Sequence, residues 1–472
     1  MACLACQFLP IGTDSAAKQR NRPKTCPTGR EWQTQLGPGD AIPVRNEGGQ
    51  AGTFPHLVAA PYSYPMTRDD ARDTAELTAF RAEVRTFLAA NASPRKQTSP
   101  WAIAFHTKSD EARQAFERGR AWQGKLFANS LAGLTYPTAL GGRGATAWHE
   151  QIFAEEAAKF DASPRFVGAT IAMLGPTLMK HATEEQQAFY VPRLLSGEYA
   201  FCQLFSEPGA GSDLAGLATK AVRDGDEFVV SGQKVWNSAA QFCNWGMLLV
   251  RTDPDVPKHR GITFLLVDMT SPGIEVRPLV QPTGGAEFNE VFLTDVRVPV
   301  ANVIGEINSG WGPARTVMSN ESAFIGSANT ISTFTRLKLL AEMFAKTDDP
   351  VLRQSLAVTY TRERILTMMS DRIMIAVRRR GVPPMDPSIL KLFIAQNRVL
   401  SGDLAMQISG FAGVATDDEV SIWIQNESMG RFSISIGGGT NEVQRNNLAE
   451  RALGLPKEPR NDHVLAWRDV PR

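Results

Sequence analysis

A run of three glycines, Gly437 to Gly439, lies in the stretch IGGGTNEVQRNNLAER and directly precedes Thr440. Glycine has no Cβ, so such a backbone can approach a flat or anionic group closely. Thr440, Asn441 and Glu442 have side chains suited to capping a final helix. None of the three glycines can accept a proton, so proton chemistry at this loop requires a base from elsewhere in the chain.

A second glycine-containing segment is FCQLFSEPGAGSDLAG at 201–216, which contains Ser206, Gly209, Gly211 and Ser212. Free backbone N–H groups and two hydroxyls in such a loop can hold the edge of a flavin or a phosphate. A glycine-rich loop is a weak signal by itself, because a plain connection between two domains has the same composition. Its interpretation depends on the motifs that accompany it.

The segment GQKVWNSAA follows and places Trp236 two positions before Ser238. On a strand, residues two apart share one face of the sheet. An indole and a hydroxyl on one face can stack against an isoalloxazine ring and hydrogen-bond its polar edge. The alternative is that Trp236 is a core residue, as aromatic residues on strands usually are.

Helices are predicted over residues 67–200, because apolar residues recur there at spacings of three and four. The first helix shows this spacing in Leu77, Phe80, Val84, Phe87 and Leu88. Thr183 and Gln186 fit a capping box at the start of a later helix. This part of the chain is predicted to form an N-terminal α-helical domain.

The hydrophobic period changes over residues 201–300, where short runs such as GITFLLVDM and EVFLTDVRVP alternate with Asp-Gly and Pro-Gly turns. Such runs predict strands, and the region is predicted to be a small β-barrel domain. Helical spacing returns over 301–458, with a last helix from about Asn441, and predicts a C-terminal helical bundle followed by a tail at 459–472. The predicted fold class is mainly α with a central β domain.

The order and spacing of the motifs resemble the acyl-CoA dehydrogenase family over roughly residues 67–458. The landmarks are YP at 136–137 with GGRG at 141–144, SEPGAGSD, GQKVWNSAA, DVRVP with GEINSGW, and GTNEVQRN with AERALGLP. Each landmark is weak alone, but together and in register they are not a coincidence. The resemblance implies a four-helix C-terminal bundle and an FAD held between that bundle and the β domain.

In that family a carboxylate removes the α-proton of an acyl-CoA thioester while the flavin N5 atom accepts a hydride from the β-carbon. By motif position, the resemblance implies contacts with the flavin ring from Phe205, Ser206, Gly211, Trp236 and Ser238. It implies that Ser212 contacts the cofactor and the acyl-CoA. It also implies that the rest of FAD is contacted, from a neighbouring subunit, by Gln407, Gly410, Thr440 and Glu442.

The position of the base follows from the same resemblance. Many members carry the glutamate just before the Gly-Thr of the glycine loop, where this sequence has Gly438. Isovaleryl-type members place it on the first long bundle helix instead, and counting on from Asn308 to Gly310 reaches Glu321. Apolar residues at offsets of three and four indicate an inward face: Val317, Met318, Phe324 and Ile325. Desolvation there raises a carboxyl pKa toward that of a useful base, whereas the alternative is a surface glutamate.

Two departures from the family pattern concern this site. Ser322 stands where the family usually has an arginine beside the base, and the Arg-x-x-Phe-Gly motif that reaches the FAD pyrophosphate is missing. The pyrophosphate contact is therefore unassigned, and Arg336 and Arg353 are expected to form surface ion pairs instead. Gly438 is expected to contact the substrate, because its backbone N–H can polarise the thioester carbonyl.

The leading hypothesis is an FAD-dependent acyl-CoA dehydrogenase of lipid metabolism that forms trans-2-enoyl-CoA, as in fatty-acid β-oxidation, and passes electrons to an electron-transfer flavoprotein. A homodimer, a homotetramer or a hetero-oligomer is expected. Two alternatives stay open: a flavin oxidase or monooxygenase on the same fold, and a base-deficient subunit of a hetero-oligomeric dehydrogenase. The acyl group is not legible, although a base on the helix suggests branched, long or sterol-derived chains by resemblance.

Composition excludes several other classes of protein. The chain has 472 residues, 43% of them hydrophobic, and a formal net charge of +1, which does not indicate binding to nucleic acid or acidic membranes. No apolar run approaches the roughly 18 residues of a spanning helix, so a cytoplasmic protein is expected, with a mitochondrial one as the less favoured alternative. The histidines lack metal-site spacing and the five cysteines are an odd set, so neither a metal site nor a disulfide framework is expected.

Residues 1–66 mix Gly, Pro, Gln, Arg and Thr without a sustained period. Such a segment cannot bury a core, and it is predicted to be a disordered or non-native N-terminal extension that reflects a misplaced start site. The alternative is an organelle transit peptide, because the first 30 residues carry five basic residues against the single acid Asp14.

Overall fold

The computed structural model describes residues 74–95, 99–103, 109–162, 165–327, 332–380, 386, 388–415, 418–459, 462 and 464–471. The predictions for residues 1–66 lie outside these ranges. All described residues belong to one unit, Arg68–Arg472. None of the described helices is both long enough and apolar enough to cross a bilayer.

The first part of this unit is helical, as its apolar spacing predicts. Its helices are α1 (Ala75–Asn91), α2 (Ser109–Ala128), α3 (Ala147–Ala157), α4 (Arg165–His181) and α5 (Glu184–Ser196). All five apolar residues predicted for the inner face of α1 are buried. The predicted capping box at α5 is present: the Gln186 N–H donates to Thr183 Oγ1 at 3.2 Å, and the Thr183 N–H donates to Gln186 Oε1 at 3.0 Å.

The middle part is a curled seven-stranded sheet. Its strands are β1 (Phe201–Leu204), β2 (Lys220–Asp224), β3 (Glu227–Lys234), β4 (Trp245–Arg251), β5 (Ile262–Asp268), β6 (Ile274–Leu279) and β7 (Phe288–Pro299). They pair in the order β1-β4-β2-β3-β7-β6, and β5 pairs with β4. The predicted turn between β2 and β3 forms at Gly225, whose φ of 64° suits glycine.

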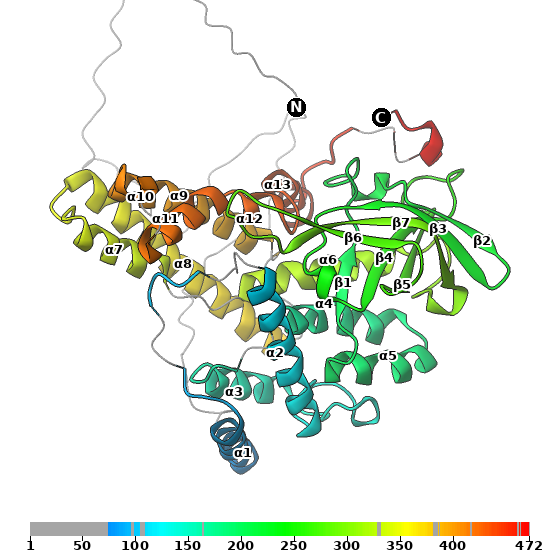
Figure 1. The fold of residues 1–472 in the computed structure, drawn as a ribbon, viewed down its shortest axis with the longest axis horizontal. Coiled ribbons are helices and arrows are strands. Elements are labelled where there is room, and N and C mark those ends of the chain that lie inside the picture. Colours follow the sequence, from blue (N-terminus) through cyan, green and yellow to red (C-terminus); the bar gives the residue numbers. More distant parts are fainter. Residues whose placement is uncertain are drawn as a thin grey trace, which may run out of the picture. The chain divides into compact units, whose positions relative to one another are not determined.

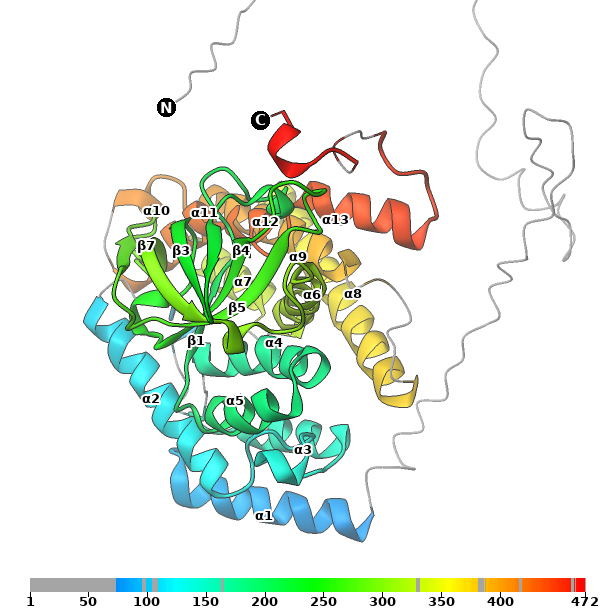
Figure 2. The same ribbon diagram turned by 90° about the vertical axis from the view of Figure 1, so that its right-hand side faces the viewer.

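Strand β5 explains how helices and sheet share their cores. Its side chains alternate, so that Phe264 and Leu266 join the core formed with the N-terminal helices, while Leu265 and Val267 join a core inside the curl of the sheet. Both faces of this strand are therefore covered, which accounts for its continuous apolar run. Figure 2 shows α4 and α5 packed beneath the sheet.

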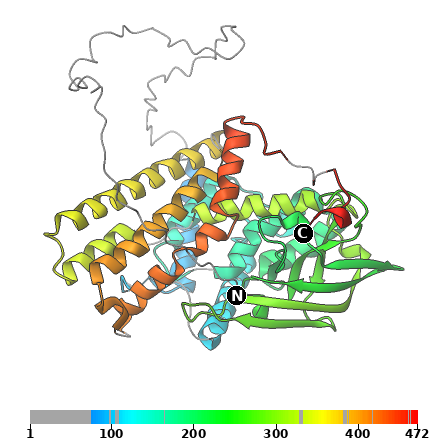
Figure 3. The ribbon, with the colours of Figure 1, turned by 90° about the horizontal axis from the view of Figure 1, so that it is seen from above.

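The last part is a helical bundle. Its helices are α6 (Trp311–Ser327), α7 (Thr333–Met343), α8 (Pro350–Arg380), α9 (Ser388–Ser409), α10 (Ala412–Ala415), α11 (Glu419–Gly430), α12 (Ser433–Ile436) and α13 (Asn441–Asn447). Helix α7 starts directly after Ser332, whose side chain caps it by accepting from the Thr335 N–H at 3.2 Å. Figure 1 shows α7, α8, α9 and α11 side by side, and α6 contacts both α9 and β5 (Figure 3).

Beyond α13, the C-terminal segment, residues 462 and 464–471, returns to the β domain. The indole N–H of Trp467 donates to the Gly216 carbonyl at 3.2 Å, and the Arg251 guanidinium lies 4.9 Å from the centre of the Trp467 ring. The buried Lys258 ammonium binds Asp462 at 2.6 Å and Asp213 at 2.8 Å. Residues of the predicted tail are thus attached to the loop at 206–216.

Candidate functional site

The site begins where β1 ends. Phe205, directly after the strand, is buried and meets Phe264 edge to face, with ring centres 5.9 Å apart. The next carbonyl, of Ser206, accepts the Val235 N–H at 2.9 Å. This hydrogen bond joins the loop at 206–216 to the segment that follows β3, so the two motifs read from the sequence are adjacent in space.

The loop at 206–216 is anchored from below by a buried ion pair. Lys234 is fully buried, and its Nζ donates to Glu207 at 2.8 Å and to the Phe205 carbonyl at 3.1 Å. Burial by itself raises the pKa of Glu207, but the Lys234 charge and the hydrogen bonds from the 218–219 backbone outweigh it and leave that pKa lowered. Above this anchor the loop is open, because a Cβ added at Gly209 or Gly211 would meet no atom within 4 Å.

Trp236 and Ser238 lie outside β3, contrary to the interpretation that they share one face of a strand. The strand ends at Lys234, and Trp236 has a φ of 64°, which no extended strand residue adopts. Both side chains are nevertheless exposed, Trp236 by 61%, because the intervening Asn237 is buried and donates to the Gln203 carbonyl at 2.7 Å. The exposed indole of Trp236, the hydroxyl of Ser238 and the open backbone of the loop at 206–216 together suit a flat ring system.

Glu321 is brought to this region by α6. One turn earlier on the same helix, Val317 is buried, while the side chains of Phe324 and Ile325 lie outside those described. The Glu321 carboxyl hydrogen-bonds to Gln203, the residue that also receives Asn237. Burial raises the pKa of Glu321, although the hydrogen bond from Gln203 and the charge of Lys391 oppose this effect. Glu321 as a whole residue is half-buried rather than fully enclosed.

The run Gly437 to Gly439, called the glycine loop below, is fixed by two side chains, Gln444 and Lys391, that were not among the predicted site residues. Gly438 and Gly439 have φ values of 65° and 82°, a region that favours glycine. The buried Gln444 donates to the Gly438 carbonyl at 2.8 Å, and the buried Lys391 donates to the Gly439 carbonyl. Ser212, the other residue expected at the substrate, lies exposed in the loop at 206–216.

The residues expected to bind the rest of FAD fall into two groups at opposite ends of α9. Thr440 caps α13 by accepting from the Val443 N–H at 3.2 Å, and the exposed Glu442 acts electrostatically on Lys391 near the start of α9. Gln407 and Gly410 are exposed at the other end of α9. Sixteen residues separate Lys391 from Gln407, which is about 24 Å along a helix. A single chain therefore does not bring these two groups together.

The surface position expected for Arg336 is wrong, whereas the ion pair expected for Arg353 stays a prediction. Arg353 is exposed on α8, and neither arginine forms an ion pair with any residue in the described ranges. The Arg336 guanidinium is half-buried 5.8 Å from the centre of the Trp423 ring, and burial lowers its pKa. Its sequence position, in an amphipathic helix, gave no sign of the tryptophan beside it.

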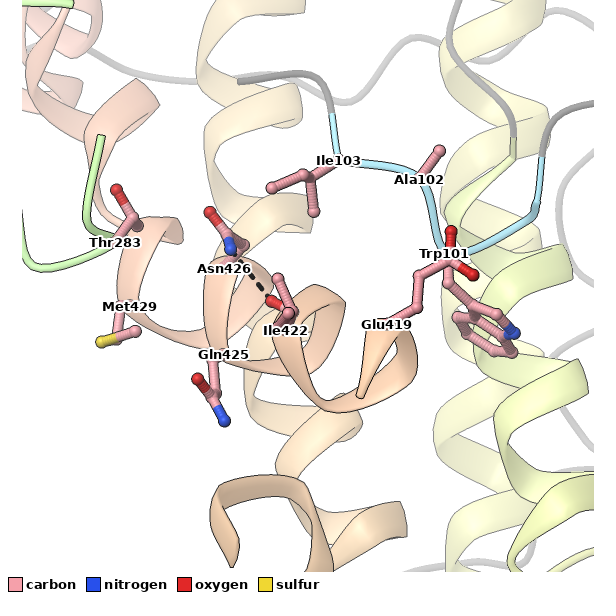
Figure 4. Close-up of a pocket in the computed structure, with 9 residues that line it drawn as sticks. All are labelled: Trp101, Ala102, Ile103, Thr283, Glu419, Ile422, Gln425, Asn426 and Met429. Carbon is pink, nitrogen blue, oxygen red and sulfur yellow. Dashed lines mark hydrogen bonds between the residues drawn. The ribbon is translucent and has the colours of Figure 1, made fainter. Parts of the chain in front are cut away.

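A pocket of about 430 Å³ lies where α11 meets residues 101–103 and the loop that carries Thr283 (Figure 4). Its lining consists of Trp101, Ala102, Ile103, Thr283, Glu419, Ile422, Gln425, Asn426 and Met429. It includes none of the residues that the sequence predicted for the site. The amide of Asn426 donates back to the Ile422 carbonyl of its own helix at 2.9 Å, so this polar group is already satisfied.

Comparison with known proteins gives matches over almost all of the described part of the chain. Models of the N-terminal, middle and C-terminal domains of acyl-CoA dehydrogenases match residues 74–198, 202–296 and 337–453. The acyl-CoA dehydrogenase IpdE1 of Mycobacterium tuberculosis is 37% identical over 385 residues, which cover 80% of this chain and 98% of that relative.

Two solved structures extend these similarities to three dimensions. The Tcur3481-Tcur3483 steroid ACAD is 30% identical with a TM-score of 0.64. The ChsE4-ChsE5 complex from Mycobacterium tuberculosis is 29% identical with a TM-score of 0.63. Each match covers 83% of this chain and 100% of the other chain.

Proposed function

Because the chain belongs to the acyl-CoA dehydrogenase family, whose members are FAD-dependent oxidoreductases, we propose that it converts an acyl-CoA thioester into its trans-2-enoyl-CoA and passes the electrons to an electron-transfer flavoprotein. The observation that carries this proposal is the environment of the Glu321 carboxyl group. This group is desolvated on α6 and hydrogen-bonded to Gln203, which lies just before the open loop at 206–216.

Glu321 is proposed as the base that removes the α-proton. Desolvation makes its carboxylate a stronger proton acceptor than an exposed glutamate, which suits the weakly acidic α-position of a thioester. The side chain of Gln203 orients the Glu321 carboxyl group. Its backbone carbonyl accepts a hydrogen bond from the side chain of Asn237, the residue that follows Trp236. Through Gln203, the end of β1 thereby connects the proposed base with the segment at 236–238 that is proposed to contact the flavin.

When bound, FAD would supply the acceptor for the hydride that leaves the β-carbon. The residues that support its binding are the exposed Trp236 and Ser238 and the open backbone at Gly211. Ser206, whose carbonyl is tied to Val235, keeps this platform in register with the loop. These groups orient a flat ring and leave its outer face accessible to the substrate.

The backbone N–H of Gly438 is proposed to polarise the thioester carbonyl. Neither the Gly438 N–H nor the Gly439 N–H donates to any other group within the described ranges. Such donors, aimed where negative charge develops during α-proton removal, stabilise the transition state. The glycine loop would then serve the substrate although it contains no base.

Anaerobic bleaching of the bound flavin by a panel of acyl-CoAs, with wild type beside Glu321→Gln, tests this function. A dehydrogenase with Glu321 as its base gives a wild type that bleaches and a variant that retains FAD but does not. Equal bleaching of both proteins would move the base elsewhere. The absence of bleaching in both would direct attention to a missing partner chain or to a substrate that is not a thioester.

We also propose that the cofactor site is completed by a second subunit. The separation of Gln407 and Gly410 from Thr440 and Glu442 along α9 supports this arrangement. So does an exposed apolar row on α8, formed by Val351, Val358, Ile365 and Met368. Size-exclusion chromatography with light scattering distinguishes this assembly from a monomer.

A hetero-oligomer with a catalytically deficient chain is the second candidate for the assembly. The names of both solved relatives above join two proteins, and Ser322 and Gly438 depart here from the usual catalytic pattern. Activity that requires co-expression of another chain would support it, whereas an active homo-oligomer would exclude it.

The acyl group is proposed to be bulky, because one relative is named a steroid ACAD. A panel of straight-chain, branched and polycyclic acyl-CoAs tests this class, and a preference for straight chains contradicts it. The electron acceptor is tested separately. Rapid reoxidation of the reduced, product-bound flavin by air would favour a flavin oxidase over a dehydrogenase.

A further inference from the structure

Lys391 is fully buried in the first turn of α9, which is unusual for a lysine. Its ammonium group donates to the carbonyl of Gly439, so this lysine is attached directly to the glycine loop. Burial without compensation is costly for a charged group, and a position of this kind therefore indicates a specific role.

The carboxylates that act on Lys391 come from two of the elements packed against α9. Glu442 lies in the first turn of α13, and Glu321 lies on α6. Glu442 forms its contact ion pair with Arg445, at 2.8 Å, rather than with the lysine. Burial lowers the pKa of Lys391, and the two carboxylates oppose that change.

Besides Lys391, the described titratable side chains on the elements packed against α6 are Lys180 and His181 of α4, Asp268 of β5, and Arg398 and Asp403 of α9. On α4, His181 binds Thr316, which lies more than one turn earlier on α6. On β5 the charged residue is Asp268, at the end of the strand. Within the described ranges, Lys391 is thus the charged group that acts on the Glu321 carboxyl.

The glycine loop is anchored in three successive steps. The Gly437 N–H donates to the Ser433 carbonyl at 2.8 Å, Gln444 holds the Gly438 carbonyl, and Lys391 holds the Gly439 carbonyl. Because a peptide unit is planar, fixing a carbonyl also fixes the direction of the N–H that follows it. Gln444 and Lys391 thus fix the N–H groups of Gly439 and Thr440, and the peptide unit that carries the Gly438 N–H lies between the anchored units on either side of it.

We propose that Lys391 is a positioning residue that couples the two halves of the chemistry, holding the glycine loop in place through Gly439 while its charge favours the ionised form of Glu321. This inference rests on the proposed function, since it assigns a role relative to the base and to the loop. Gln444 shares the first task and not the second, because its amide carries no charge.

The test compares Lys391→Met, Lys391→Gln and Gln444→Met with wild type. Lys338→Met is the matched control, because Lys338 lies on the bundle surface and its ion pair among the described residues is with Glu342 of its own helix. The rate of anaerobic flavin reduction by an acyl-CoA is measured against pH. The carboxyl titration of Glu321 is followed separately by infrared difference spectra against Glu321→Gln, with and without flavin.

Removing the lysine charge makes the Glu321 carboxylate harder to form, so the acid limb of the rate profile is expected to move to higher pH in both lysine variants. Their limiting rates are expected to fall on the order of tenfold or more, because the loop loses its alignment. Gln444→Met is expected to lower the rate with an unmoved acid limb, and Lys338→Met to match wild type.

The inference is overturned if either lysine variant keeps the wild-type acid limb and the wild-type carboxyl titration. An unchanged rate in Gln444→Met overturns the role of the anchored loop. The infrared arm requires only folded protein, so a lysine variant that loses flavin still decides the electrostatic role. A wild type that shows no flavin reduction would instead count against the proposed function, which keeps the two failures separate.

Discussion

The two sides of the site each contain a buried lysine and a glutamate, but they combine them differently. On the β-domain side, Lys234 contacts Glu207 at 2.8 Å, and the glutamate pKa is lowered. On the bundle side, Lys391 contacts a backbone carbonyl and acts on Glu321 without a contact ion pair, and burial leaves the glutamate pKa raised. The same residue types thus form a fixed support on one side and a proton acceptor on the other.

The largest expected effect concerns the proton acceptor. Glu321→Gln removes the proposed base while keeping its shape, so flavin reduction by an acyl-CoA is expected to slow by about a hundredfold to ten-thousandfold. Stopped-flow absorbance under anaerobic conditions measures this rate. Glu207→Gln, the same chemical change on the β-domain side, should slow it far less, and equal losses in the two variants would remove the functional contrast.

A large effect on stability is expected from breaking the ion pair between Lys234 and Glu207. Glu207→Gln leaves the Lys234 charge buried without a counter-charge and is expected to cost about 3 kcal/mol of unfolding free energy at neutral pH. Because the folded-state pKa of Glu207 is lowered, its contribution is present above the unfolded pKa and is lost as pH falls through the folded pKa. Urea unfolding at neutral and acidic pH measures the difference, which should shrink on acidification.

The opposite sign is expected for Glu321→Gln. Because the folded-state pKa of Glu321 is raised, ionising it costs stability once the pH has risen through that pKa, and the cost is absent below the unfolded value. The variant should therefore melt slightly above wild type at neutral pH, and this gain should disappear on acidification. A variant that melts below wild type at neutral pH would show that Glu321 is also a support.

The smallest effect on stability is expected from Trp467, which attaches the C-terminal segment to the β domain. Trp467→Phe keeps the ring against Arg251 and removes the hydrogen bond to the Gly216 carbonyl, with an expected cost of about 1 kcal/mol. Urea unfolding measures it, and the FAD dissociation constant shows whether the loop at 206–216 senses the change. A loss of several kcal/mol would mean that the C-terminal segment is a principal support of the β domain.

Local patterns predicted the elements well where local interactions decide them. The apolar spacing of α1 and the capping box at Thr183 are properties of a few neighbouring residues, and both are confirmed. The start of α7 has a local signal of the same kind in Ser332, because serine is a favoured N-cap residue. The end of β3 at Lys234 has no such sequence signal, because nothing in the sequence shows that Trp236 adopts a positive φ.

The site was harder to predict because its partners are distant in sequence. Lys391 is the one charge in the apolar run SILKLF at the start of its helix, a pattern shared by many surface lysines. Gln203 lies in a short strand, and its hydrogen bond to Glu321 depends on how α6 crosses the sheet. The roles implied by resemblance, such as those of Ser238 and Gly438, remain predictions.

The attachment of the C-terminal segment to the β domain also bears on synthesis of the chain. Trp467 and its acceptor Gly216 are separated by 251 positions, and Asp462 and Lys258 by 204. Residues 462–471 are translated after the sheet, the bundle and the loop that they hold. We therefore expect the loop at 206–216 to lack these anchors until Asp462 and Trp467 have left the ribosome, so that full cofactor retention is acquired late in synthesis.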